Sequence, residues 1–124
     1  MITEDYVSFE IAKLLKEKGF EGDVNAYYHI WDNGHRVCPV QEFTHSEAPH
    51  LYIPAPTLQM AMKWLREVHN LWCEISPEGK GLWYREVYSL TDEEYIPNSN
   101  GHKIKSYEEA CEAAIKYSLE NLIK

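Results

Sequence analysis

Three histidines and a cysteine in the first half of the chain are residue types that bind zinc. Imidazole and thiolate groups are common zinc ligands. His35, Cys38, His45 and His50 follow one another with the spacing H-x2-C-x6-H-x4-H. This spacing matches no standard zinc-binding pattern. We therefore expect no metal or cofactor, with surface imidazoles and a buried Cys38. A metal site in the His45/His50 loop is the alternative.

A second candidate pair is His69 and Cys73, because an imidazole that removes the proton of a nearby thiol creates a nucleophile. The sequence indicates no third group that would orient the imidazole, and a thiol buried in a core is inert. A histidine near the C-terminal end of a helix also interacts favourably with the helix dipole. No glycine-rich phosphate-binding loop occurs in the chain. We expect a protein that is not an enzyme; the alternative is a small enzyme with its site near His69 or in the His45/His50 loop.

The composition predicts one folded domain that is unusually rich in aromatic residues. Of the 124 residues, 44% are hydrophobic and 26% are charged, which is typical of a globular protein. A chain of this length can bury one core, so we expect a single domain spanning residues 1–124. Nine tyrosines, four tryptophans and three phenylalanines are available. Such residues dominate both cores and interfaces.

Charge and cysteine usage narrow the classes of partner and compartment. Twenty acidic and twelve basic residues give a formal charge of −8, which repels nucleic acid and anionic lipid. The chain has no apolar run of about 18 residues that would span a membrane. The start, MITEDYVSFE, lacks the basic and apolar segments of a signal peptide. Three cysteines indicate reduced thiols. We expect a cytoplasmic protein without nucleic-acid or membrane partners.

Hydrophobic periodicity and turn residues predict the order helix, hairpin, helix, hairpin, helix. Gly19 is expected to end the first helix in the left-handed conformation, and Ser106 with Glu109 forms a capping box for the last. The helix that follows Thr57 is apolar over about 200° of its circumference, so it should contact a sheet and another element. The fold class is α+β, with a mostly antiparallel sheet of four to five strands and three helices. The first helix is expected between residues 3 and 18, with Ser8 as a rival N-cap. The second helix follows Thr57, and the third follows Ser106 and runs nearly to the end of the sequence. The predicted hairpins are 24–43 and 71–90.

The second hairpin predicts an aromatic face on the sheet. If Leu71, Cys73 and Ile75 face the helices, Trp72 faces away, since side chains alternate along a strand. On the partner strand we expect the set that faces the helices to be Leu82, Tyr84, Tyr88 and Leu90. Trp83, Arg85 and Val87 would then face away as well. A register slip of one residue would reverse these directions.

The first hairpin extends the same prediction. Tyr27, His29 and Trp31 share one side of their strand, opposite Val24, Ala26, Tyr28 and Ile30. Because an antiparallel sheet normally presents polar residues to water, an aromatic face suits a protein partner or a second copy of the chain. The predicted interaction surface consists of Tyr27, His29, Trp31, Trp72, Trp83 and Arg85.

Three segments, "YVSFEIAKLLKEKGF", "APTLQMAMKWLREVHN" and "SYEEACEAAIKYSLENLI", carry a resemblance to a known group. They resemble small uncharacterised proteins encoded in prophages and mobile elements of Bacteroidetes-type gut bacteria. The resemblance implies a bacterial cytoplasm and an accessory gene. It carries over no activity, cofactor or catalytic residue.

These observations favour a non-enzymatic module for protein interaction or self-association. The phage context of the resemblance adds an alternative, an acidic inhibitor of a host nucleic-acid enzyme. That inhibitor would need carboxylates spaced like phosphates, and a charge of −8 is modest for such a role.

Overall fold

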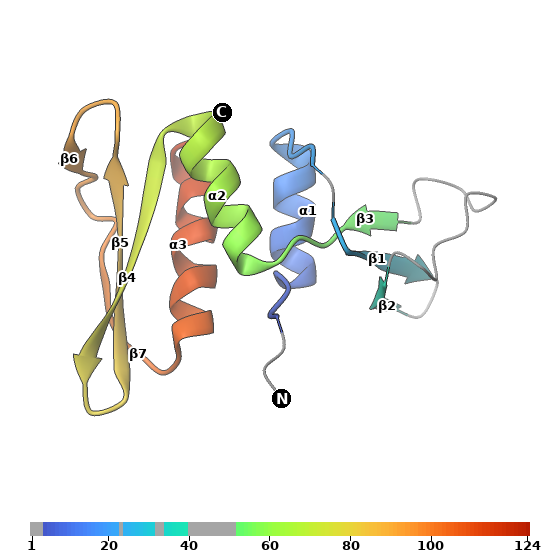
Figure 1. Ribbon diagram of the computed structural model, residues 1–124, viewed down its shortest axis with the longest axis horizontal. Helices are drawn as coiled ribbons and strands as arrows, with labels where there is room; N and C mark the ends of the chain where they lie inside the picture. Colours follow the sequence, from blue (N-terminus) through green and yellow to red (C-terminus); the bar gives the residue numbers. More distant parts are fainter. Residues whose placement is uncertain (1–3, 23, 32–33, 40–51) are drawn as a thin grey trace. The chain divides into compact units, whose positions relative to one another are not determined.

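The computed structural model of the protein describes residues 4–22, 24–31, 34–39 and 52–124 (Figure 1). The side chains of Trp31, Arg36 and Pro39 lie outside this description. The contacts of the chain divide it into two compact units, Met1–Thr57 and Leu58–Lys124. We call them the N-terminal and C-terminal units and describe each by itself. The single-domain organisation expected from length stays a prediction.

The N-terminal unit begins with helix α1 (Phe9–Glu17). The Ser8 hydroxyl caps it by accepting a hydrogen bond from the Ile11 amide at 3.3 Å. The predicted end of the helix is confirmed, because Gly19 has φ of 90° and the Phe20 amide donates back to the Leu15 carbonyl at 2.9 Å. The helix starts after Ser8, the rival N-cap, because its hydroxyl satisfies the Ile11 amide.

Three short antiparallel strands complete this unit: β1 (Ala26–Trp31), β2 (Gly34–Pro39) and β3 (Tyr52–Pro54). They lie in the order β2-β1-β3. The predicted directions in β1 are confirmed for Ala26 and Tyr28, which are buried. The Tyr28 hydroxyl donates to the Val7 carbonyl at 2.6 Å, and its ring packs edge-on against Phe9 of α1. Tyr28 of the central strand β1 therefore contacts both α1 and the segment just before it.

The C-terminal unit contains two helices and a four-stranded antiparallel sheet. Figure 1 shows both helices on the same face of this sheet, so the opposite face has no helix of this unit over it. No helix in the described part of the chain is long and apolar enough to cross a membrane. The elements are α2 (Leu58–His69), β4 (Leu71–Gly79), β5 (Leu82–Ser89), β6 (Glu94–Tyr95), β7 (Gly101–Ile104) and α3 (Tyr107–Asn121).

The core of the C-terminal unit lies between the two helices and the sheet. As predicted, α2 contacts both the sheet and a helix, α3. Its buried stripe is narrower than the apolar arc, since Val68 is 57% exposed. The Ser106 hydroxyl accepts from the Glu109 amide at 3.1 Å, which confirms the predicted cap of α3. The residues of α2 and α3 that are buried are Leu58, Ala61, Met62, Leu65, Ala110, Cys111, Ala114, Ile115, Ser118 and Leu119.

The α+β class, the antiparallel pairing and the order of the elements are confirmed. The strands form a three-stranded and a four-stranded sheet, whereas we expected one sheet of four to five strands. In the described residues β1 pairs with β2 and β3, whereas β5 pairs with β4, β6 and β7. Short strands β6 and β7 within residues 91–105, expected to be mostly loop, complete the second sheet.

The predicted direction of the side chains in β5 is wrong, and a bulge in β4 is the reason. At the turn, Gly79 pairs with Leu82; continuing this register would pair Cys73 with Tyr88. The register instead shifts between Pro77 and Gly79, so that Cys73 pairs with Val87. One extra residue in a strand reverses which side chains of its partner share its buried face. Trp83, Arg85 and Val87 therefore face the helices.

The bulged residue, Glu78, is hydrogen-bonded to β7. Its carboxylate accepts a hydrogen bond from the Lys103 amide at 2.6 Å and lies 2.9 Å from Nδ1 of His102. These contacts, first the Lys103 amide and then His102, lower the pKa of Glu78 below its ordinary value of 4.5. These two contacts connect the bulge of β4 to β7, which pairs with β5 on its other side.

The contacts of the Glu78 carboxylate predict that the stability depends on pH. Because the pKa of Glu78 is lower in the folded than in the unfolded chain, its contribution is complete above pH 4.5 and is lost as the pH falls through the lowered pKa. In urea titrations, the free energy of unfolding of wild type should approach that of Glu78→Gln as the medium is acidified. Glu120→Gln, an exposed change in α3, removes the same charge and should change the free energy of unfolding at neutral pH by less than Glu78→Gln does. A constant offset for Glu78→Gln would contradict the prediction.

Candidate functional site

The histidines and cysteine of the first half of the chain do not form a metal site among the described residues. His35 and Cys38 are three residues apart in β2, so their side chains lie on opposite faces of the sheet. The His35 ring stacks on Phe9 with centroids 3.9 Å apart, and Cys38 is buried. His45 and His50 lie outside the described residues.

His69 and Cys73 do not have the character of a nucleophilic pair. Burial raises the pKa of the Cys73 thiol to about 12, despite a hydrogen bond with Ser118 of α3 that lowers it. The thiol is therefore protonated at neutral pH, whereas a reactive cysteine has a lowered pKa. His69 packs against the Trp64 ring, with centroids 4.7 Å apart. Its Nε2 atom is buried and has no hydrogen-bond partner in the described part of the chain.

The six residues of the predicted interaction surface do not come together on one face. Trp83 and Arg85 lie between β5 and α3, where Trp83 packs edge-on against Tyr107 at 5.4 Å and Arg85 lies over the Tyr117 ring at 5.4 Å. These two residues belong to the packed layer, contrary to the expectation. Trp72 faces away from the core as predicted and is 43% exposed.

The other three predicted residues belong to the N-terminal unit. Tyr27 and His29 are half-buried and lie on the side of β1 opposite Tyr28. The His29 ring stacks on Tyr52 of β3, with centroids 4.8 Å apart. Trp31 ends β1, and its side chain lies outside the described residues. The prediction thus combined residues from two separate sheets.

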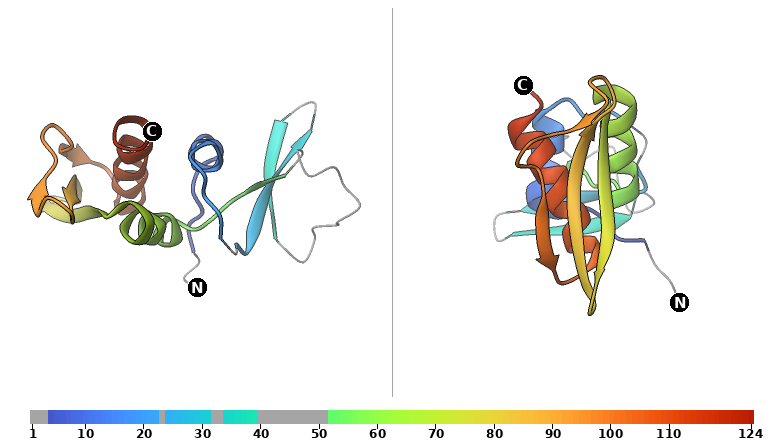
Figure 2. Two further views of the ribbon diagram at one scale, coloured as in Figure 1. Left: turned by 90° about the horizontal axis from the view of Figure 1, so that it is seen from above. Right: turned by 90° about the vertical axis from the view of Figure 1, so that its left-hand side faces the viewer.

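An aromatic row crosses the exposed face of the second sheet. Trp72 of β4 lies directly opposite Tyr88 of β5, and Tyr88 lies opposite Tyr95 of β6. The Tyr88 and Tyr95 rings meet edge-to-face at 5.0 Å, and Tyr95 is 46% exposed. The right-hand view of Figure 2 looks onto this face of the sheet. We call this the outer face, and its residues are Trp72, Glu74, Ser76, Tyr84, Glu86, Tyr88, Tyr95 and His102.

Next to the aromatic row the outer face carries two carboxylates. Glu74 and Glu86 are directly opposite each other on β4 and β5. Like charges at such positions repel, which costs stability. Each accepts a hydrogen bond from a tyrosine hydroxyl, Glu74 from Tyr95 and Glu86 from Tyr84. Both carboxyl groups of the pair are therefore bonded to tyrosine hydroxyls.

The tyrosines beside these carboxylates stay neutral. Burial, followed by the bond to Glu86, raises the pKa of Tyr84 to about 12. The hydrogen bond to Glu74 is the main cause that raises the pKa of Tyr95. Both phenols are thus donors at neutral pH. Beyond the carboxylates, the Tyr84 ring packs against His102 at 4.8 Å, so aromatic rings lie on both sides of the acidic pair.

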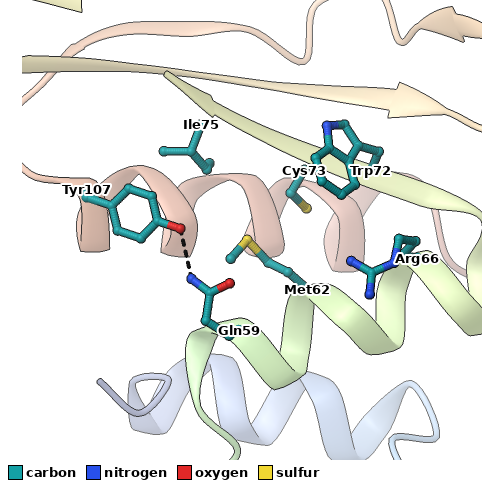
Figure 3. Close-up of a pocket in the computed structure, with 7 residues that line it drawn as sticks. All are labelled: Gln59, Met62, Arg66, Trp72, Cys73, Ile75 and Tyr107. Carbon is teal, nitrogen blue, oxygen red and sulfur yellow. Dashed lines mark hydrogen bonds between the residues drawn. The ribbon is translucent and has the colours of Figure 1, made fainter. Parts of the chain in front are cut away.

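A small pocket opens on the other side of β4. It has a volume of about 160 Å³ and lies between α2, β4 and the start of α3 (Figure 3). Figure 3 shows Arg66 and Trp72 at one end and a Gln59–Tyr107 hydrogen bond of 2.8 Å at the other. Met62, Cys73 and Ile75 lie between them. Trp72 belongs to both the pocket and the outer face because β4 has no strand on its far edge in the described residues.

The fold and these two sites define the class of protein as an α+β protein whose second sheet exposes an aromatic and acidic face. No protein-family model, curated protein or solved structure matches this chain. The function is therefore inferred from the geometry of the sites themselves.

Sequence reasoning missed Tyr84, Glu86, Tyr88, Tyr95 and the acid pair. Alternation did identify Tyr84 and Tyr88 as one set, but assigned that set to the core. The sequence did not decide between the two sets, because Glu86 falls in the set of Tyr84 and Tyr88 whereas Arg85 falls in the set of Val87. Tyr95 lies in a segment too short to reveal a strand by periodicity.

Proposed function

We propose that this protein is a non-enzymatic protein-interaction module and that the outer face of the β4–β7 sheet is its docking surface. The observation that supports it most directly is the aromatic row of Trp72, Tyr88 and Tyr95 on a sheet face without a helix of its own unit. Aromatic residues are enriched at the centre of protein interfaces, where they exclude water. An accessory protein of a prophage or mobile element would use such a face to bind a protein of its cell.

The charge of the outer face favours a partner with basic side chains. Glu74 and Glu86 lie at its centre, whereas the cations Arg66 and Lys103 lie at its margins, beside Trp72 and Glu78 respectively. A lysine or arginine of a partner placed over the acidic pair would meet carboxylates and the faces of neighbouring rings. Two copies that meet through this face around a two-fold axis would bring the acidic pairs toward each other. A basic partner segment is therefore the occupant that we propose.

The test uses a partner isolated by affinity capture from the native cell, identified, and purified for titration calorimetry. Replacing both Trp72 and Tyr88 with serine should weaken binding by about a hundredfold, since central aromatic residues contribute most of the binding energy. Val68→Ser, which removes an exposed apolar residue from α2, should leave the affinity within about twofold. Equal affinities for wild type and the double variant would contradict the docking surface.

Charge variants test the kind of partner separately. Glu74→Gln with Glu86→Gln should weaken binding and reduce its dependence on salt, whereas Glu108→Gln with Glu120→Gln, the same change of charge on α3, should not. Loss of binding in the aromatic variant alone would retain the docking surface and reject the basic partner. Self-association in sedimentation that the aromatic variant abolishes would show that the occupant is a second copy. A monomer that binds no partner would contradict the proposal.

A further inference from the structure

The pocket between α2, β4 and α3 has an apolar floor of definite size. Met62 and Cys73 are buried there, and Ile75 is half-buried. Its volume of about 160 Å³ is close to that of an apolar cavity, about 150 Å³, that holds a benzene ring. The floor therefore suits a ligand body of one ring or a short branched chain.

One end of the pocket carries a cation without a counter-charge. Arg66 is half-buried, and the structure gives it no ion pair or hydrogen bond within the described residues. Its guanidinium group lies 5.9 Å from the centre of the Trp72 ring, which holds the group beside the pocket. In a protein with a formal charge of −8, a partly desolvated guanidinium next to an apolar floor favours an anionic ligand.

The other residues that line the pocket add no charge at neutral pH. Burial is the main cause that raises the pKa of Tyr107, so its hydroxyl stays protonated. The raised pKa of Cys73 keeps its thiol neutral as well. Gln59 and Tyr107 are joined by a hydrogen bond in which the Gln59 amide donates to the Tyr107 hydroxyl, and both groups are neutral. The pocket thus has a net charge of +1, located on Arg66.

We propose that this pocket binds a small monocarboxylate with an apolar body about the size of a benzene ring. The carboxylate would pair with the Arg66 guanidinium through two parallel hydrogen bonds, and the body would lie over Met62, Cys73 and Ile75. A single guanidinium matches the two oxygens of a carboxylate, whereas a phosphate dianion needs further donors. This ligand site shares Trp72 with the outer-face docking surface, but its charge and its apolar floor come from Arg66, Met62, Cys73 and Ile75.

The test is a titration of the whole protein with benzoate, benzamide and benzylamine, followed by amide and indole NMR. Benzoate should shift the Trp72 indole signal and the amides of the lining residues. Benzamide has the same shape without the charge and should bind about tenfold more weakly, as should Arg66→Met with benzoate. Lys63→Met removes a charge from the exposed side of the same helix and should leave the affinity within about twofold.

Arg66→Gln provides a second variant without the charge, and a dispersed spectrum verifies that each variant is folded. The inference is overturned if benzoate causes no shifts up to its solubility limit. It is also overturned if benzoate and benzamide bind equally, if the shifts lie outside the pocket, or if both Arg66 variants retain the wild-type affinity. Tighter binding of benzylamine than of benzoate would assign the pocket to cations instead.

Discussion

Replacing Val87 with aspartate should strongly destabilise the C-terminal unit. Val87 is completely buried and lies opposite Cys73, whose thiol forms a hydrogen bond with Ser118 of α3. A carboxylate at this position would lose its water without gaining a cation, which costs about 3 to 5 kcal/mol. Folded domains are stable by only about 5 to 15 kcal/mol, so a large part of the stability would be lost. Urea denaturation followed by circular dichroism measures the difference.

A matched substitution on the outer face separates burial from charge. Ser76→Asp introduces the same carboxylate in β4, but on the face that carries Tyr84 and Tyr88. Because water reaches this half-exposed position, the expected loss of stability is below about 1 kcal/mol. If Val87→Asp were tolerated as well as Ser76→Asp, the register of β5 would be wrong, and with it the composition of the outer face.

The second large effect is expected at Ser99. Its side chain is completely buried between β6 and β7, where its hydroxyl accepts from the Val87 amide at 3.1 Å and donates to the Ile96 carbonyl at 2.7 Å. Ser99 thereby supplies the hydrogen bond that a continuous neighbouring strand would supply to β5. Ser99→Ala leaves the Val87 amide buried without a partner, which should cost about 2 kcal/mol.

Hydrogen exchange offers a direct measurement of this effect. The Val87 amide should exchange faster in Ser99→Ala than in wild type. The increase in its exchange rate should be at least as large as the loss of global stability alone would cause. Thr91→Ala, an exposed change in the segment between β5 and β6, should leave both the exchange rate and the stability close to wild type. Unchanged protection of Val87 in Ser99→Ala would show that another group satisfies the amide.

Local signals in the sequence predicted much of the fold. Gly19 ends α1, Ser106 caps α3, and the buried residues of α2 and α3 lie within the apolar faces that their periodicity indicated. In the first hairpin, alternation predicted the buried Ala26 and Tyr28 correctly. These features depend on residues within one or two helical turns or within one strand. They can therefore be predicted from the sequence before it is known which elements pack together.

The functional surface depended on contacts far apart in the chain. Both alternating sets of β5 contain aromatic and aliphatic residues, so its sequence alone does not select the buried set. The bulge at Glu78 makes that selection, and the contacts of its carboxylate are with His102 and Lys103, more than twenty residues away. The tertiary structure therefore decided that Tyr84 and Tyr88 lie outside and that Trp83 and Arg85 lie inside.

The sequence by itself determined the fold class, the order of the elements and the presence of an aromatic strand pair. Only the tertiary structure determined the row of Trp72, Tyr88 and Tyr95, the acidic pair and the pocket at Arg66. The physical reason is that side-chain direction in a strand has a period of two residues. A single inserted residue therefore exchanges the two faces of the neighbouring strand without changing the secondary structure.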